Sequence, residues 1–272
     1  DEGLECSSRG FGNGAKYYFI KNSAQEAFSG WVGVDADFES AALYNPYTDE
    51  SGLASIRREK TGNQVYLSLE AGQSILLQTS PAQLKADKYH FFDKEAGEQT
   101  LSGEWKVEFL LGGPVLPQSV TVKNLGSWTE YGPEYRDFSG SAMYSTSLEE
   151  LDIEPDRYYR LDLGEVEQSA AVYLDGKKVA TLYEKPYSLT LKSADLAGVK
   201  TLSVRVSSSC ENRIAYMDRN NIPWRIFYNV NVAARTPESR GEDGLFSAAR
   251  WSTVPCGLMG PVKLIPLRVS EQ

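Results

Sequence analysis

Apolar residues recur at every second position along most of the chain, and this alternation constrains the fold more than any other feature. Val65, Leu67 and Leu69 alternate with Tyr66 and Ser68, and segments 159–163 and 202–206 follow the same period. Because successive side chains of a strand point to opposite faces, each segment predicts a strand with one buried face. We find no convincing amphipathic helix longer than two turns, so the pattern predicts an all-β protein.

The strongest local signal is a β-hairpin centred on Asp175 and Gly176. Alternating runs at 170–174 and 178–182 flank this pair. Both turn positions of such a hairpin require positive φ, which Gly and Asp adopt at low steric cost. Many short strands with Gly, Pro, Asn and Asp between them are typical of sandwiches and barrels.

A domain boundary is predicted where the alternation stops. Residues 93–100 are polar and aperiodic, and a second set of strands begins near Trp105. Polar, aperiodic segments between two strand sets are typical of linkers. We therefore predict two β-sandwich domains, a smaller one over residues 1–92 and a larger one over residues 93–272.

Charge and composition exclude several kinds of partner. The chain has 272 residues and a net charge of -9, which repels the phosphate backbone of nucleic acids. No apolar run approaches the roughly 20 residues that cross a bilayer, so we expect no membrane insertion. The first residues lack the charged and apolar regions of a signal peptide, so a mature product or an excised fragment is expected.

The cysteines give no metal motif. Cys6, Cys210 and Cys256 are too widely spaced for zinc-binding patterns. One disulfide could form among them, but we predict three unpaired thiols, because free cysteine often packs as a small apolar residue.

The sequence offers no motif for nucleophilic hydrolysis, and among its 37 acidic residues some pair would always have glycosidase spacing, so their number decides nothing. His90 is the single histidine, and its neighbours Tyr89, Phe91 and Phe92 favour packing. The sequence has no G-x-S-x-G nucleophile motif and no glycine-rich phosphate loop between a strand and a helix. We predict no catalytic residue and no cofactor, apart from a structural calcium that Asp35 and Asp37 could bind from one strand face.

Aromatic and cationic residues cluster in predicted loops. A Trp ring can cover the C–H face of a sugar while Arg, Asn and Asp bind its hydroxyl groups. The alternative is that these rings close the ends of a sandwich or a domain interface. If sugars bind, the predicted contact residues are Trp128, Tyr131, Tyr135, Arg136, Trp224, Arg225 and Trp251.

Several ordered segments of the second domain resemble the sugar-binding-like jelly-roll domain of glycoside hydrolase family 2. Residues 103–109 are similar to its opening strand, and residues 138–148 to its F-S-G-x-A-x-Y-x-x-x-F strand, with Leu at the final aromatic position. Residues 161–176 are similar to L-D-L-G-x-V followed by A-x-V-x-L-N-G, with Asp175 in place of Asn. Residues 257–264 match the closing G-L-x-G-P-V-x-L segment.

Over the whole chain, the sequence motifs are most similar to those of the C-terminal region of glycoside hydrolase family 106, the α-L-rhamnosidase-like enzymes. Residues 212–214 resemble its N-R-L/I element. In the first domain, residues 17–22 resemble its Y-F-I-x-N element, and residues 67–74 its L-x-L-x-P-G-Q-S element, with Ala71 replacing Pro. The resemblance implies that the second sandwich is a galactose-binding-like jelly roll.

The resemblance also implies an accessory role. In that family the catalytic carboxylates and the metal belong to a barrel domain N-terminal to this region, so no catalytic residue is transferred to this chain. The expected partners are a carbohydrate or polysaccharide and that N-terminal barrel, and the expected location is secreted, periplasmic or at the cell surface. Two alternatives stay open: a stand-alone carbohydrate-binding or cell-surface adhesion protein, and a small sandwich-fold hydrolase or lyase.

Overall fold

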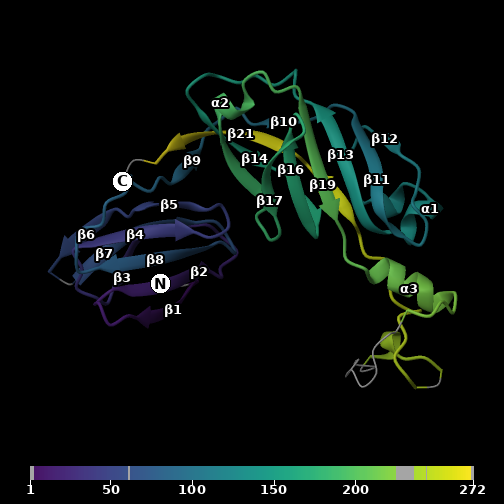
Figure 1. Cartoon of the computed structure of the whole chain (residues 1–272), viewed down its shortest axis with the longest axis horizontal. Helices are drawn as coiled ribbons and strands as arrows, with labels where there is room; N and C mark the ends of the chain where they lie inside the picture. The colour runs from purple at the N-terminus through teal and green to yellow at the C-terminus, as the bar shows by residue number, and fades with distance from the viewer. Residues whose placement is uncertain (1–2, 61, 225–235, 243, 271–272) are drawn as a thin grey trace. The chain divides into compact units, whose positions relative to one another are not determined.

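The computed structural model describes residues 3–60, 62–224, 236–242 and 244–270 (Figure 1). Strands dominate and pair in antiparallel sheets, which confirms the all-β sandwich prediction. Two compact units form, one from residues 1–97 together with 265–272 and the other from residues 98–264. The predicted division at residue 92 differs from this one, because residues 267–269 pair with residues 92–94 and so return to the first unit.

Unit 1 contains a five-stranded sheet in the order β1-β2-β8-β4-β5 and a three-stranded sheet in the order β3-β7-β6. A short strand, β9, pairs with the end of the last strand, β21. The strand bounds are Leu4–Gly10 (β1), Lys16–Asn22 (β2), Phe28–Val34 (β3), Ser40–Asn45 (β4), Glu50–Leu53 (β5), Ile56–Glu59 (β6), Gly62–Leu69 (β7), Ser74–Ser80 (β8), Phe92–Lys94 (β9) and Lys263–Val269 (β21).

Alternation along these strands builds the core of unit 1. Ile20 of β2 and Leu77 of β8 are buried, as are Val65 and Leu67 of β7, while their sequence neighbours are more exposed. These side chains belong to one buried cluster drawn from both sheets. Removing this apolar area from water is the main force that holds the two sheets together.

Unit 2 contains a six-stranded sheet in the order β12-β11-β13-β19-β16-β17, a second sheet in the order β10-β21-β14-β18, and the pair β15-β20. The further bounds are Gln99–Thr100 (β10), Trp105–Gly113 (β11), Val120–Val122 (β12), Ser139–Ser147 (β13), Tyr158–Asp162 (β14), Glu165–Glu167 (β15), Ser169–Leu174 (β16), Lys177–Leu182 (β17), Ser188–Lys192 (β18), Thr201–Ser207 (β19) and Gly257–Gly260 (β20).

The predicted hairpin is confirmed in unit 2. Strands β16 and β17 pair with Leu174 opposite Lys177, so Asp175 and Gly176 are the two turn residues. Their φ angles are 44° and 78°, both in the left-handed region. The Asp175 carboxylate also accepts the backbone N–H of Thr201 at 2.9 Å, which ties this turn to the start of β19.

Helical structure is limited to short pieces, with one exception. The bounds are Trp128–Glu130 (η1), Pro133–Arg136 (α1), Ser193–Leu196 (α2), Glu211–Arg219 (α3) and Pro237–Ser239 (η2). At 3.6 residues per turn, the nine residues of α3 exceed the two-turn limit that the sequence predicted. The prediction was wrong because α3 buries only Asn212 and Ala215, which leaves almost no apolar stripe to detect. No described helix is long and apolar enough to cross a membrane.

Candidate functional site

Two of the predicted sugar-contact residues lie in the core of unit 2. Trp128 is 0% exposed, and its ring packs edge-on against Phe109 and Phe138 at centroid distances of 5.8 and 5.7 Å. Tyr135 is buried as well, and its hydroxyl donates to the Gln118 carbonyl at 3.3 Å. A ring without an exposed face cannot stack on a sugar. The structure therefore corrects the prediction for these two residues and assigns them to packing.

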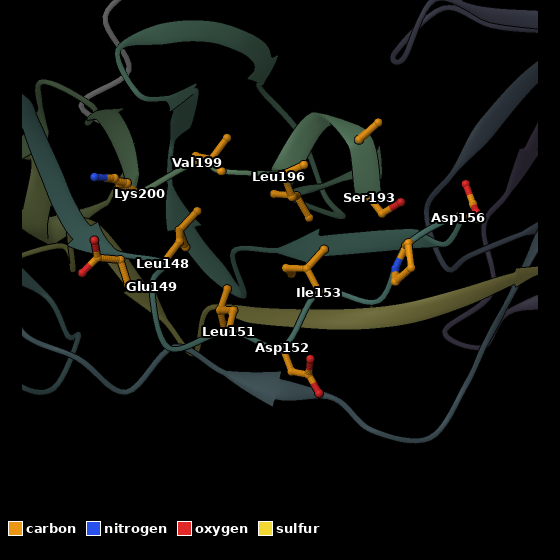
Figure 2. Close-up of a pocket in the computed structure, with 14 residues that line it drawn as sticks. Leu148, Glu149, Leu151, Asp152, Ile153, Asp156, Ser193, Leu196, Val199 and Lys200 are labelled. Carbon is orange, nitrogen blue, oxygen red and sulfur yellow. The ribbon is translucent and has the colours of Figure 1, made fainter.

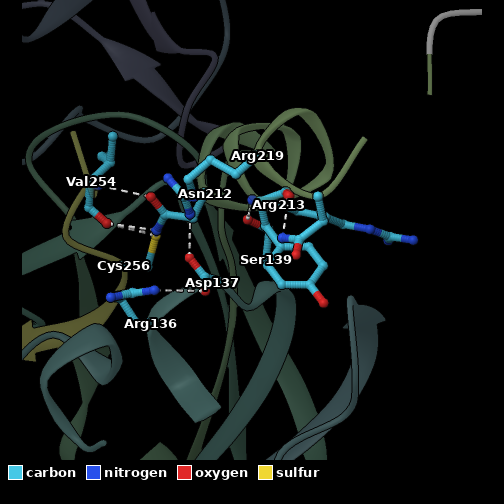
Figure 3. Close-up of polar contacts among 10 residues, drawn as sticks. Arg136, Asp137, Ser139, Asn212, Arg213, Arg219, Val254 and Cys256 are labelled. Carbon is cyan, nitrogen blue, oxygen red and sulfur yellow. Dashed lines mark hydrogen bonds and ion pairs between the residues drawn. The ribbon is translucent and has the colours of Figure 1, made fainter. Parts of the chain in front are cut away.

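Two other predicted sugar-contact residues form local contacts within unit 2. Tyr131 is half-buried, and its hydroxyl donates to the Gly126 carbonyl at 3.2 Å. Arg136 is exposed and forms an ion pair with Asp137 at 3.1 Å. Asp137 also pairs with Arg219 at the end of α3. Asp137 therefore links the end of α3 to the sandwich, while Arg136 is a second cation on the same carboxylate (Figure 3).

The start of α3 is fixed by a buried amide. The Nδ2 atom of Asn212 donates to the Val254 carbonyl at 2.8 Å, and its Oδ1 atom accepts the Val254 N–H at 2.8 Å (Figure 3). Asn212 Nδ2 also lies 3.4 Å from the Cys256 thiol, whose pKa burial raises to about 12. The Ser139 hydroxyl accepts the backbone N–H of Arg213 at 3.1 Å. These bonds give α3 a defined position on unit 2.

The far end of α3 positions Trp224. The helix ends at Arg219, and the next turn is closed by the Ile222 N–H, which donates to the Met217 carbonyl at 2.8 Å. The Asp218 carboxylate then accepts two donors, the Trp224 indole N–H at 2.5 Å and the Ala248 backbone N–H at 2.7 Å. Bonds to a charged acceptor are stronger than neutral ones, so Asp218 fixes the indole plane.

An aromatic row continues from this indole. The Trp224 ring meets Phe246 edge-on at 6.3 Å, and Phe246 meets Trp251 edge-on at 5.8 Å. The indole N–H of Trp251 donates to the Ser239 hydroxyl at 3.1 Å. All three rings are partly exposed, unlike Trp128. Phe246 thus brings together Trp224 and Trp251, which are 27 positions apart in the sequence.

The loop after η2 places charged side chains beside this aromatic row. The backbone of Arg240 pairs with that of Phe246 in an antiparallel bridge, and Gly241 donates to the Leu245 carbonyl at 2.8 Å. This pairing places the Arg240 side chain at the aromatic row. Arg240, Glu242 and Arg250 line a cleft of about 740 Å³ together with Trp224 and Phe246.

The cleft combines the groups that polyhydroxylated ligands require. The Trp224 ring offers a partly exposed apolar plate that Asp218 holds in one plane. Two guanidinium groups and one carboxylate supply planar donors and acceptors at its rim. A concave site with an apolar wall and a few polar groups is the usual form of a small-ligand site. The predicted residue Arg225 lies outside the described residues.

A second hollow of unit 2 is larger but chemically poorer. Its volume is about 850 Å³, and it lies between the loop after β13 and helix α2. Figure 2 shows Leu148, Ile153 and Leu196 facing its interior, while the carboxylates of Glu149 and Asp152 point away. The described residues that line it include no aromatic ring. It therefore lacks a plate for stacking.

The predicted calcium ligands lie in a loop of unit 1. Asp35 and Asp37 follow the end of β3 and are exposed, which corrects their expected place on a strand face. They border a cavity of about 400 Å³ together with Asn63, whose amide donates to the Ala36 carbonyl at 3.1 Å. Among the described residues, no third acidic, His or Cys side chain joins them. Calcium binding here stays a prediction.

Sequence reasoning missed most of the cleft. Asp218, Arg240, Glu242 and Phe246 were not among the predicted site residues, because none of them directly adjoins a Trp in the sequence and only the fold brings them to Trp224. One signal was present: Asp218 precedes Trp224 by six residues, close enough for a carboxylate to reach an indole N–H across a helix end.

No protein-family model matches the chain. A putative β-glucuronidase from Formosa agariphila is 32% identical over 117 residues, which cover 42% of this chain and 10% of that protein. The solved rhamnosidase from Novosphingobium sp. PP1Y has a TM-score of 0.71 and 25% sequence identity, over 98% of this chain and 24% of the rhamnosidase. The chain thus spans only a small part of each. Both units are similar to the β-sandwich portion of a glycoside hydrolase.

Proposed function

We propose that this chain is a non-catalytic accessory region of a glycoside hydrolase and binds polysaccharide through the cleft beside Trp224. The observation that supports the proposal most directly is the partly exposed indole ring of Trp224. Asp218 holds it in one plane, and Arg240, Glu242 and Arg250 surround it with hydrogen-bonding groups. A preorganised plate loses little side-chain entropy when a ligand stacks on it.

The likeness to a rhamnosidase supports the context of this proposal. It covers 98% of this chain but 24% of the rhamnosidase, as expected if a separate part of the larger protein performs hydrolysis. From the motifs at residues 17–22, 67–74 and 212–214, we propose that the parent protein resembles glycoside hydrolase family 106. In that case unit 2 is a galactose-binding-like jelly roll and a catalytic barrel precedes it.

The same proposal sets the expected partners and location. The ligand is a polysaccharide with exposed hydroxyl groups, and the protein partner is the catalytic barrel of the parent enzyme. We also propose a secreted, periplasmic or cell-surface protein, since a polysaccharide is too large to enter a cell intact. A net charge of -9 is compatible with solubility in any of these places.

A binding experiment tests the cleft directly. The chain is screened on a glycan array that includes rhamnose- and uronate-containing polysaccharides, and the best ligand is then titrated calorimetrically. Trp224→Ala should raise the Kd at least tenfold, which corresponds to about 1.4 kcal/mol. Trp31→Ala is the matched control, because Trp31 is a partly exposed Trp of unit 1 that does not line the cleft.

Two outcomes would overturn the proposal. One is a folded chain that binds no glycan on the array, which would leave only a scaffold role. The other is equal loss of affinity in Trp224→Ala and Trp31→Ala, which would remove the cleft as the cause. The thermal midpoint of each variant is measured in parallel, so that lost binding is not confused with lost folding.

A further inference from the structure

Strand β1 is one edge of the five-stranded sheet of unit 1 (Figure 1). It pairs with β2 without a register shift from Leu4 to Gly10, and every residue after Leu4 is exposed. Edge strands of soluble proteins are usually shortened, bulged, covered or protected by Lys or Pro, because an open edge can pair with another strand. Among the described residues, β1 shows none of these features.

The opposite edge of the same sheet is covered. Its last strand, β5, lies beside residues 87–89. The Leu53 N–H donates to the Asp87 carbonyl at 2.7 Å, and the Tyr89 N–H donates to the Leu53 carbonyl at 2.9 Å. The sheet is therefore closed at β5 and open to a further strand at β1.

The hydrogen bonds to β2 show which backbone groups of β1 remain available. Just beyond the two ends of this strand pair, the Ser23 N–H donates to the Gly3 carbonyl at 2.7 Å. The Phe11 N–H likewise donates to the Ala15 carbonyl at 2.9 Å, and both bonds continue the register of the pair. Hydrogen-bonded and non-hydrogen-bonded pairs alternate along an antiparallel ladder. Odd-numbered residues of β1 therefore bond to β2, and the N–H and C=O groups of its even-numbered residues point to the open edge: Leu4, Cys6, Ser8 and Gly10.

Two unlike charges lie on one face of β1. Glu5 and Arg9 are exposed and stand on either side of Ser7, and side chains two residues apart on a strand share a face. On β2, Lys21 lies opposite Glu5 and Tyr17 lies opposite Arg9. No described residue forms an ion pair with Glu5 or Arg9. Because the two charges have opposite signs and are placed symmetrically about Ser7, the strand is complementary to a reversed copy of itself.

We propose that β1 is an interaction surface for a second copy of this chain, with the two β1 strands antiparallel and centred on Ser7. In this register the even-numbered residues of the two strands form the hydrogen-bonded pairs, Leu4 with Gly10 and Cys6 with Ser8. These are the residues whose backbone groups point to the open edge, and their pairing forms about eight hydrogen bonds. The two five-stranded sheets thereby join into one.

The charges select this register. Glu5 of each copy lies opposite Arg9 of the other in a non-hydrogen-bonded pair, where side chains approach most closely. Opposite charges in cross-strand pairs stabilise a sheet, and like charges destabilise it. A shift of two residues in either direction places Glu5 opposite Ser7 or Phe11 of the second copy and removes both ion pairs. Each Glu5 in the dimer lies between Lys21 of its own chain and Arg9 of the other.

Charge reversal tests the interface on the full chain. A single strand pair is a small interface, so sedimentation should show a weak monomer–dimer equilibrium with a Kd of about 0.1 mM. Glu5→Arg and Arg9→Glu should each raise this Kd at least tenfold, because two ion pairs become two like-charge pairs. An equimolar mixture of the two variants should associate again, because the mixed dimer pairs Arg with Glu at both contacts. Glu50→Arg is the matched control, since Glu50 is exposed on β5 at the covered edge.

Disulfide cross-linking tests the register. Cys6→Ser and Cys210→Ser first remove the two exposed thiols. Ser7→Cys then places one thiol at the centre of the strand pair, where opposed Cα atoms are about 4.5 Å apart, which is within disulfide range. Under mild oxidation this chain should form a covalent dimer at least tenfold faster than Ser51→Cys in the same background. Ser51 is the control because it is exposed on β5.

Four results would each overturn the proposal. They are a native chain that stays monomeric up to about 1 mM, charge-reversal variants that associate like the native chain, a mixture of Glu5→Arg and Arg9→Glu that associates no better than each variant alone, and equal cross-linking rates for Ser7→Cys and Ser51→Cys. The substituted side chains are exposed, so the thermal midpoint of each variant should lie within about 3 °C of the native value. This measurement separates lost association from lost folding.

Discussion

Replacing Asp218 by Asn separates the role of its charge from its shape. Its two carboxylate oxygens accept the Trp224 indole N–H at 2.5 Å and the Ala248 N–H at 2.7 Å. An amide has one acceptor, so Asp218→Asn keeps one of these bonds and turns an NH₂ group toward the other donor. Losing one hydrogen bond to a charged group costs about 1.5–3 kcal/mol. We expect unit 2 to lose about 2 kcal/mol of unfolding free energy.

Asp218→Asn should also weaken glycan binding, by less free energy than it removes from the stability of unit 2. Without its fixed acceptor, the Trp224 ring must be ordered when the ligand binds. Immobilising one such side chain costs about 0.5–1.5 kcal/mol, which corresponds to a Kd roughly 2- to 12-fold higher. Asp218→Asn should therefore bind glycan more weakly than the native chain but more tightly than Trp224→Ala, because the plate is still present.

Urea denaturation and calorimetric titration measure the two effects on the same protein. Asp152→Asn is the matched control, because Asp152 is exposed on a loop of unit 2 away from α3. It should change neither quantity beyond about 0.5 kcal/mol. If Asp218→Asn has the same unfolding free energy and the same Kd for glycan as the native chain, Asp218 does not position the Trp224 ring.

Two further predictions concern buried side chains of unit 2. Trp128→Ala should lower the unfolding free energy by about 3–5 kcal/mol in urea, because it empties a fully buried site among Phe109 and Phe138; a loss below about 1 kcal/mol would contradict this. Thiol titration at pH 8 should detect the exposed Cys6 and Cys210 quickly and the buried Cys256 only after unfolding. The thiolate is the reactive form, and burial raises the Cys256 pKa from 9.0 to about 12, so this thiol stays protonated at pH 8. Equal rates for all three thiols would show that Cys256 is accessible.

Local patterns were sufficient to predict the fold class and the hairpin. Alternation in residues 65–69 and 202–206 depends only on which face of a strand is buried, and the Asp175–Gly176 turn depends only on φ preferences. Helix α3 was missed because its stability comes from single contacts, such as Asn212 with Val254, and not from an apolar stripe. A contact between residues 42 positions apart leaves no periodic trace in the sequence.

The predicted site was only partly recovered for a related reason. Trp128 and Trp224 both follow turn-forming residues and look alike in sequence. Their packing partners differ. Trp128 packs against Phe109 and Phe138, which lie on or beside strands of unit 2. Trp224 follows the end of a helix and keeps part of its ring in water. Exposure of an aromatic residue is a tertiary property, so sequence can nominate such residues but cannot rank them.

Strand β2 shows where a sequence pattern becomes informative once the sheet is known. Strand β2 is apolar on both faces, with Tyr18 and Ile20 inward and Tyr17 and Phe19 outward. A strand of this kind predicts burial on both sides, as in a central strand covered by two layers. In unit 1 the outward side lies in water instead, and the apolar side chains there contribute little to the core. Aromatic residues favour strands on either face, and exposed apolar side chains are common on soluble proteins, so Tyr17 and Phe19 need no ligand to account for them.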